Sequence, residues 1–137
     1  MFTILFAAIG PALLLLWYVY RKDTQPEPTR MIIKGFFYGG LSALISTFIS
    51  GPLLNMGFYT TDPQSWLEAV KISFFGAAIP EECAKLLMFW LLLRNNEEID
   101  ESYDGIVYAT CIGLGFAAFE NVMYVVSAGA DWAGGAP

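Results

Sequence analysis

Long apolar runs separated by short polar segments dominate this chain of 137 residues. Four runs are long enough to cross a bilayer as helices, because about 20 apolar residues span its hydrocarbon core of roughly 30 Å. They cover approximately residues 3–20, 31–58, 65–94 and 103–128. The pattern therefore predicts an all-α, polytopic membrane protein, with residues 1–137 forming a single transmembrane domain built as a four-helix bundle.

The apolar runs contain prolines and regularly spaced small residues. Gly10-Pro11, Gly51-Pro52 and Pro80 lie inside them, so kinked or broken helices are expected there. Two stripes of small residues recur at every fourth position, one in the second run (Gly35, Gly39, Ala43, Thr47, Gly51) and one in the fourth (Gly105, Ala109, Gly113, Ala117, Asn121). Each stripe should let a neighbouring helix approach closely.

Composition and charge narrow the class of protein. Of the residues, 56% are hydrophobic, a larger share than in a typical soluble domain. A further feature is the 16% share of aromatic residues, which suits a membrane protein with aromatic residues at the lipid interfaces. This apolar composition makes the lipid bilayer an expected partner. The net charge of −6 comes largely from loop acids and there is no basic patch, so nucleic acid is not an expected partner. Cys83 and Cys111 fall in predicted spans and should be free thiols. Because the chain has no histidine, Cys83 is not expected to act as a nucleophile.

An ionisable cluster lies in the middle of the third apolar run, where Pro80, Glu81, Glu82 and Lys85 occur within six residues. Charges at that depth cost roughly 2.5–3.5 kcal/mol each on insertion scales, unless they pair or line a wet cavity. On a helix, Lys85 lies one turn from both glutamates and can pair with either. Pro80 removes one helical hydrogen bond, so the glutamates should begin a new segment of the kind that lines binding sites at the membrane midplane. A buried ion pair that pins two helices together is the structural alternative.

A second polar pair, Glu120 and Asn121, lies deep in the fourth run. Counted from the ends of the third and fourth runs that should share one membrane face, Glu82 lies about 18 Å deep and Glu120 about 24 Å deep. The difference is about one helical turn, which tilt can absorb. One shared pocket is therefore expected to contain Glu81, Glu82, Lys85, Glu120 and Asn121.

The distribution of lysine and arginine predicts the orientation. Basic residues occur in the segment 21–30 and, with Arg94, at the start of the segment 95–102, whereas the connection after the second run has none. By the positive-inside rule these two segments are cytoplasmic and both termini lie outside.

Several short motifs, taken together and in order, resemble the PrsW family within the wider group of glutamate-dependent intramembrane proteases. The matching pieces are Tyr-Arg-Lys-Asp at 20–23, Glu-Pro at 27–28, Glu-Glu-Cys-Ala-Lys at 81–85, Asp-Gly-Ile-Val-Tyr at 104–108, Gly-Leu-Gly-Phe at 113–116 and Phe-Ala-Ala-Phe-Glu-Asn at 116–121. The glutamate pair with lysine is a weak signal alone, and the ordered set is specific. Members of this family continue into further spans, one of which carries a histidine, so the resemblance implies a truncated or a divergent short member.

The resemblance implies a multi-pass protease of the bacterial inner membrane that hydrolyses peptide bonds of membrane proteins, with an anti-sigma factor as the family's substrate theme. A carboxylate can orient and deprotonate the attacking water. Glu81 and Glu82 are the candidates for base and partner, in either order, and Lys85 is their shared counter-charge. Glu120 is a second carboxylate or a candidate metal ligand, and Asn121 a donor to the developing oxyanion. Metal dependence stays open, because oxygen ligands without histidine make a poor zinc site.

Two other classes compete with a protease. Proton- or ion-coupled transporters also bury glutamate and lysine beside broken helices, but the sequence has no internal repeat, and four spans would have to assemble as a homo-oligomer. A non-catalytic membrane scaffold or substrate-binding relative is the other class, and the missing histidine favours it. Cleavage of a membrane protein or peptide substrate would separate the protease from both.

Overall fold

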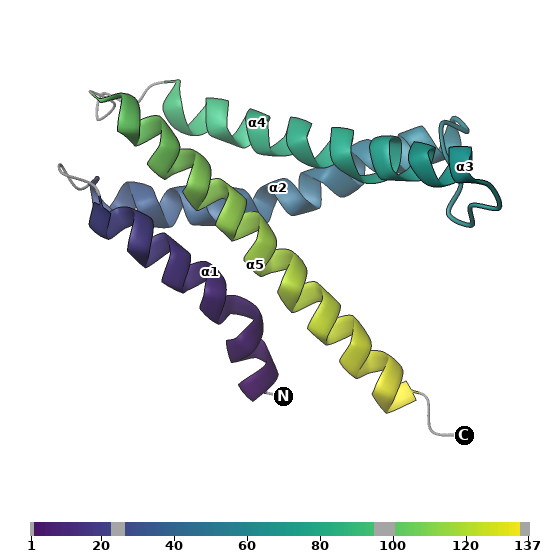
Figure 1. Cartoon of the computed structure of the whole chain (residues 1–137), viewed down its shortest axis with the longest axis horizontal. Coiled ribbons are helices and arrows are strands. Elements are labelled where there is room, and N and C mark those ends of the chain that lie inside the picture. The colour runs from purple at the N-terminus through teal and green to yellow at the C-terminus, as the bar shows by residue number, and fades with distance from the viewer. Residues whose placement is uncertain (1, 23–26, 95–100, 135–137) are drawn as a thin grey trace.

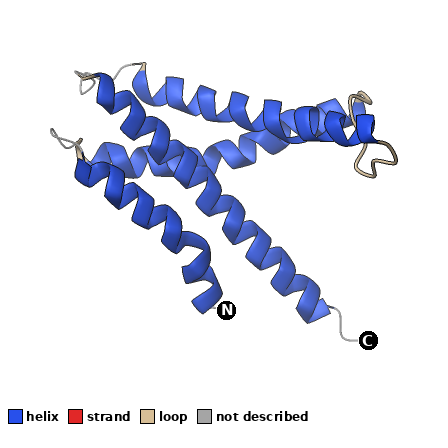
Figure 2. Cartoon of the chain, in the orientation of Figure 1, coloured by secondary structure: helices blue, strands red, loops and turns tan. Residues whose placement is uncertain are grey.

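The structure is a computed structural model that describes residues 2–22, 27–94 and 101–134. Within these ranges all regular structure is helical and there is no strand (Figure 2). The elements are α1 (Phe2–Lys22), α2 (Thr29–Asn55), α3 (Trp66–Lys71), the π-helix η1 (Ile72–Ala78), α4 (Ile79–Leu93) and α5 (Ser102–Gly134). The all-α prediction is confirmed.

The helices occupy the four apolar runs, with ends that differ by a few residues from the expected ones. The third run contains α3, η1 and α4, which follow one another without a gap. By length and composition, α2 and the segment Tyr103–Ala128 of α5 are suited to cross a membrane. The grouping of all four runs into one transmembrane domain stays a prediction.

Pro52 lies inside α2, which continues to Asn55. The expected interruption at Gly51-Pro52 is therefore wrong. Proline removes one amide donor in the last helical turn, but its carbonyl still accepts from the Met56 amide at 2.9 Å. The turn is retained because the loss is confined to one hydrogen bond near a helix end.

The central helix α2 contacts both α5 and α4, and α1 packs against α5 (Figure 1). One buried cluster joins α4 to α5 through Met88, Leu92, Tyr108 and Ile112. A second joins α2 to α5 through Ile32, Val107 and Cys111. Cys83 is exposed on α4, and both thiols are free, as predicted.

Close backbone contact joins α2 and α5, but only one of the two predicted stripes takes part. Gly35 and Gly39 of α2 are buried, and a Cβ at Gly39 would come within 2.8 Å of the Phe116 amide nitrogen. On α5 the predicted stripe is wrong, because a Cβ at Gly113 would meet nothing within 4 Å. The contact is made instead by Gly115, where a Cβ would collide with the Phe36 carbonyl. Two positions along a helix correspond to about 200° of rotation, so the buried face is nearly opposite the expected one.

The ends of α1 and α4 and the starts of α2 and α5 lie at the same end of the molecule (Figure 1). This agrees with placing the segments 21–30 and 95–102 on one side. Residues 23–26 and 95–100 lie outside the described residues. The side of the membrane on which these segments lie stays a prediction.

Candidate functional site

The glutamate pair begins α4 directly after an unusual π-helical turn. Pro80 has no amide hydrogen, and its ring crowds the carbonyl four residues earlier, so an α-helix cannot pass through it unchanged. The chain adopts the wider π pattern over Ile72–Ala78, and the Ile79 amide bonds the Phe74 carbonyl five residues back. Glu81 and Glu82 then occupy the first turn of α4. The expected break at Pro80 therefore takes the form of a change in helix type, which in other proteins often marks a functional site.

Lys85 pairs with both glutamates, but unequally. Its Nζ lies 2.8 Å from Glu82 Oε1 and 3.7 Å from Glu81 Oε2. The Glu82 side chain is 66% exposed, whereas that of Glu81 is 29% exposed. Lys85 therefore makes its close ion pair with the outer carboxylate, and the inner carboxylate keeps only a longer contact.

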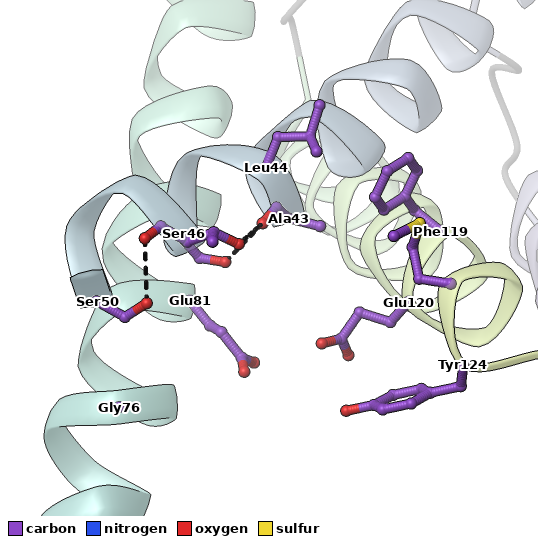
Figure 3. Close-up of a pocket in the computed structure, with 11 residues that line it drawn as sticks. Ala43, Leu44, Ser46, Ser50, Gly76, Glu81, Phe119, Glu120 and Tyr124 are labelled. Atoms are coloured by element: carbon purple, nitrogen blue, oxygen red, sulfur yellow. Dashed lines mark hydrogen bonds between the residues drawn. The ribbon is translucent and has the colours of Figure 1, made fainter. Parts of the chain in front are cut away.

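A cavity of about 310 Å³ lies among α2, η1, α4 and α5. Glu81 reaches it from α4 and Glu120 from α5, and their side chains point toward one another across the open space (Figure 3). Gly76 of η1 and Tyr124 of α5 also line it. The structure thus places two carboxylates from different helices on one cavity.

Hydroxyl groups of α2 line the side of the cavity above the carboxylates (Figure 3). The Ser46 hydroxyl donates to the Ala43 carbonyl at 2.8 Å, and the Ser50 hydroxyl donates to the Thr47 carbonyl at 3.2 Å. Each hydroxyl proton is used within the helix, so the oxygen lone pairs remain as acceptors. This wall can therefore receive hydrogen bonds from water or from peptide N–H groups.

The structure brings together only part of the predicted set. Glu81 and Glu120 line the cavity, whereas Lys85 is not among the lining residues and contacts Glu81 at 3.7 Å. Glu82 is not among the lining residues and faces outward. Asn121 is exposed on another face of α5, where its Nδ2 donates to the Ala8 carbonyl of α1 at 3.0 Å. Adjacent helical residues differ by about 100°, so Asn121 cannot share the direction of Glu120.

Three further features were not expected from the sequence: the α2 hydroxyls, Tyr124 and the contact of Phe116 with Lys85. Tyr124 follows Glu120 by four residues, so helical spacing alone could have placed it on the same face. Lys85 Nζ lies 4.1 Å from the centroid of the Phe116 ring. That contact joins two helices, and no sequence spacing indicates it.

The donor set of the described residues does not complete a metal site. No group of three or more histidine, cysteine, aspartate or glutamate residues is placed to hold a metal within the described ranges. The cavity offers two carboxylates, Glu81 and Glu120, beside neutral hydroxyls. Two carboxylates fall short of the three or four protein ligands usual for zinc.

A different carboxylate, Glu27, lies buried at the other end of the helices. It is 4% exposed and accepts a hydrogen bond from the Tyr108 hydroxyl of α5, which is itself fully buried. Asp104, one turn earlier on α5, is also buried and accepts from the Glu101 amide at 2.8 Å. The contact of Glu27 with Tyr108 ties the chain before α2 to α5, and it lies apart from the cavity.

Comparison with known proteins identifies the family. The family model described as PrsW family intramembrane metalloprotease matches residues 27–136. Proteins named Protease PrsW are similar over 97% of this chain: one from Oceanobacillus iheyensis is 40% identical, one from Geobacillus kaustophilus 32% and one from Bacillus subtilis 31%. The chain covers 59%, 56% and 58% of these relatives respectively. No solved structure matches. The match over most of its length shows that this chain belongs to the PrsW family of intramembrane proteases.

Proposed function

We propose that this chain carries the glutamate site of a membrane-embedded protease, which hydrolyses peptide bonds of membrane proteins with carboxylate-activated water. One observation carries the proposal: Glu81 and Glu120, from different helices, face one another across a single cavity (Figure 3). Family membership supports the reaction class.

The two carboxylates divide the work of hydrolysis. Glu81 is the proposed base, because its ion-pair distance to Lys85 is the longer one and its side chain borders the cavity. It accepts a proton from water as the oxygen attacks the scissile carbonyl, and that proton then passes to the leaving amine. Glu120 holds the water from the opposite side. Glu82 holds Lys85, so the two members of the adjacent pair have different roles.

Tyr124 and Asn121 have separate roles in this proposal, and the described residues do not make up a complete metal site. The described residues provide two cavity carboxylates and no third ligand of the usual kind, although the family description includes the word metalloprotease. The Tyr124 side chain lines the cavity beside Glu120 and is the proposed donor to the developing oxyanion. In this proposal Asn121, bound to the Ala8 carbonyl, stabilises the contact of α5 with α1.

The proposed setting is the bacterial inner membrane, crossed by the four apolar runs, with both termini outside and the segments 21–30 and 95–102 in the cytoplasm. The proposed substrates are single-span membrane proteins, an anti-sigma factor among them. Both proposals rest on the lysine and arginine distribution and on the family resemblance.

The proposal is tested by cleavage in liposomes. The complete natural protein is reconstituted with a panel of single-span membrane proteins, each carrying a different fluorophore at either end. Glu120→Gln should reduce cleavage about 10²-fold, because the attacking water loses the carboxylate that holds it in position. Glu68→Gln is the matched control, because Glu68 lies on α3 and is not among the cavity-lining residues. Equal cleavage by Glu120→Gln and the control would overturn the proposal.

A further inference from the structure

Lys85 of α4 contacts residues of both α4 and α5, the two helices that carry Glu81 and Glu120. Within α4 its ammonium contacts Glu82 Oε1 at 2.8 Å and Glu81 Oε2 at 3.7 Å. From α5 it meets the face of the Phe116 ring, 4.1 Å from the centroid. This is well within the distance of about 6 Å at which a ring attracts a cation. An ammonium in an apolar helix is costly unless partners surround it, and here two carboxylates and one aromatic face do so.

The backbone of Phe116 is held by contacts that do not involve Lys85. The residue is 3% exposed. Gly39 of α2 lies against its backbone amide, and the preceding Gly115 lies against the Phe36 carbonyl. The closest backbone contact between α2 and α5 therefore fixes this turn of α5. The buried Phe116 ring therefore projects from a turn of α5 whose backbone is fixed against α2.

We infer that Phe116 is a positioning residue, whose ring face holds the Lys85 ammonium beside Glu82 and thereby leaves Glu81 directed into the cavity. An aromatic face attracts the ammonium without accepting a proton and without neutralising a carboxylate. A third carboxylate in its place would compete for Lys85. The inference rests on the proposed function, because it concerns the geometry of the glutamate site.

Phe116 also links Lys85 to the second carboxylate. Glu120 follows it by four residues, so the two side chains lie on the same face of α5, one turn apart. The contact of Lys85 with the ring therefore fixes α4 relative to the turn of α5 that carries Glu120. The buried cluster of Met88, Leu92, Tyr108 and Ile112 joins α4 to α5 as well. Toward its C-terminal end α5 diverges from α4 (Figure 1).

Graded fluorination of the ring tests the inference with little change of shape. Phe116 is replaced in the complete natural protein by 4-fluoro-, 3,5-difluoro- and 3,4,5-trifluorophenylalanine, because each fluorine weakens the negative potential of the ring face. Cleavage of the best reporter found in the liposome panel should fall in kcat step by step, by about 3- to 30-fold over the series, with KM within about twofold. The same series at Phe89, a core-packed residue of α4, is the control and should be flat.

Two companion variants separate a failed inference from a failed function. Phe116→Trp keeps an aromatic face and should retain more activity than Phe116→Leu, which keeps only apolar volume. If Glu81→Gln and Glu120→Gln are inactive but the fluorinated series at Phe116 is as flat as that at Phe89, the positioning role is wrong and the glutamate site stands. If both glutamine variants cleave like the unmodified protein, the glutamate site itself fails, and the positioning role with it.

Discussion

Two parts of the molecule bury carboxylates in opposite ways. At one end, called here the closed end, Glu27 accepts a hydrogen bond from the buried Tyr108 hydroxyl. At the open end, Glu81 and Glu120 flank a cavity of about 310 Å³ where α4 and α5 have separated (Figure 3). A carboxylate enclosed by a protein donor stabilises the fold, whereas a carboxylate bordering an open volume is available for chemistry. For this reason we place the proposed reaction at the open end.

The crossing of α2 and α5 accounts for the separation of α4 and α5 at the open end. Gly39 and Gly115 bring α2 and α5 into contact near the middle of the helices. Because the two helices cross there, α5 is carried away from α4 beyond the crossing (Figure 1). The separation leaves a cavity that residues of α2, η1, α4 and α5 line without filling. The crossing near the middle of α2 and α5 therefore determines where the cavity lies.

The largest effect is expected from Glu81→Gln. Glutamine keeps the shape of the side chain but cannot act as a base, so cleavage of a membrane reporter should fall about 10²–10⁴-fold. The free energy of unfolding should change by less than about 1 kcal/mol, because Glu82 still pairs with Lys85. Both quantities are measured on the same preparation, by reporter cleavage in liposomes and by titration with a denaturing detergent. Near-normal cleavage, or loss of the fold, would show that Glu81 is a structural charge.

Gly115→Ala should have the next largest effect. Its new methyl group would collide with the Phe36 carbonyl, a backbone atom that cannot move without separating α2 from α5. We expect a loss of about 3 kcal/mol in the free energy of unfolding, at the upper end for overpacking. Gly113→Ala is the matched control, because a Cβ there meets nothing within 4 Å, and it should change stability by about 0.5 kcal/mol or less. If the two variants unfold alike, the close contact of α2 with α5 is wrong.

Tyr108→Phe tests the buried carboxylate of the closed end. The variant removes the hydroxyl that donates to Glu27 and leaves the ring in place. Loss of one donor to a buried charge should lower the free energy of unfolding by about 1–3 kcal/mol. Cleavage per folded molecule should stay normal, in contrast to Glu81→Gln. A fall in cleavage without a fall in stability would mean that the closed end takes part in the reaction.

Asn121→Ala should have the smallest effect. It removes the hydrogen bond to the Ala8 carbonyl, at a cost of about 0.5–1.5 kcal/mol in the free energy of unfolding. Cleavage should be unchanged, because Asn121 is not among the residues that line the cavity. A loss of 10²–10³-fold in kcat, typical of a missing oxyanion donor, would instead restore the catalytic role expected from the sequence.

Much of the fold follows from the apolar runs alone, because helix length and hydrophobicity are local properties of the chain. The rotation of each helix about its axis does not follow in the same way. The sequence offers Gly113 and Gly115 on nearly opposite faces of α5, and only packing against Phe36 selects between them. The choice of Gly115 is a property of the pair of helices, which is why the predicted stripe was wrong.

In the candidate site, too, some features follow from the sequence and others depend on how the helices pack. Glu81, Lys85 and Glu120 could be placed together because charges deep in apolar runs must find partners, and a count of helical depth brings them to similar levels. The outward direction of Glu82, the contact of Asn121 with α1 and the ring of Phe116 beneath Lys85 depend on how three helices are oriented. The catalytic roles of the predicted residues stay predictions.

Photocrosslinking can show whether the peptide bond that is cleaved lies in the cavity between Glu81 and Glu120. Benzoylphenylalanine replaces Phe119, which lines the cavity, or Phe37, which is 71% exposed on α2, in the complete protein carrying Glu81→Gln. After irradiation with a membrane reporter in liposomes, mass spectrometry locates the adduct. We predict adducts from position 119 on residues flanking the bond that the active protein cleaves, and none there from position 37. Adducts at that bond from position 37, or none from position 119, would contradict the account.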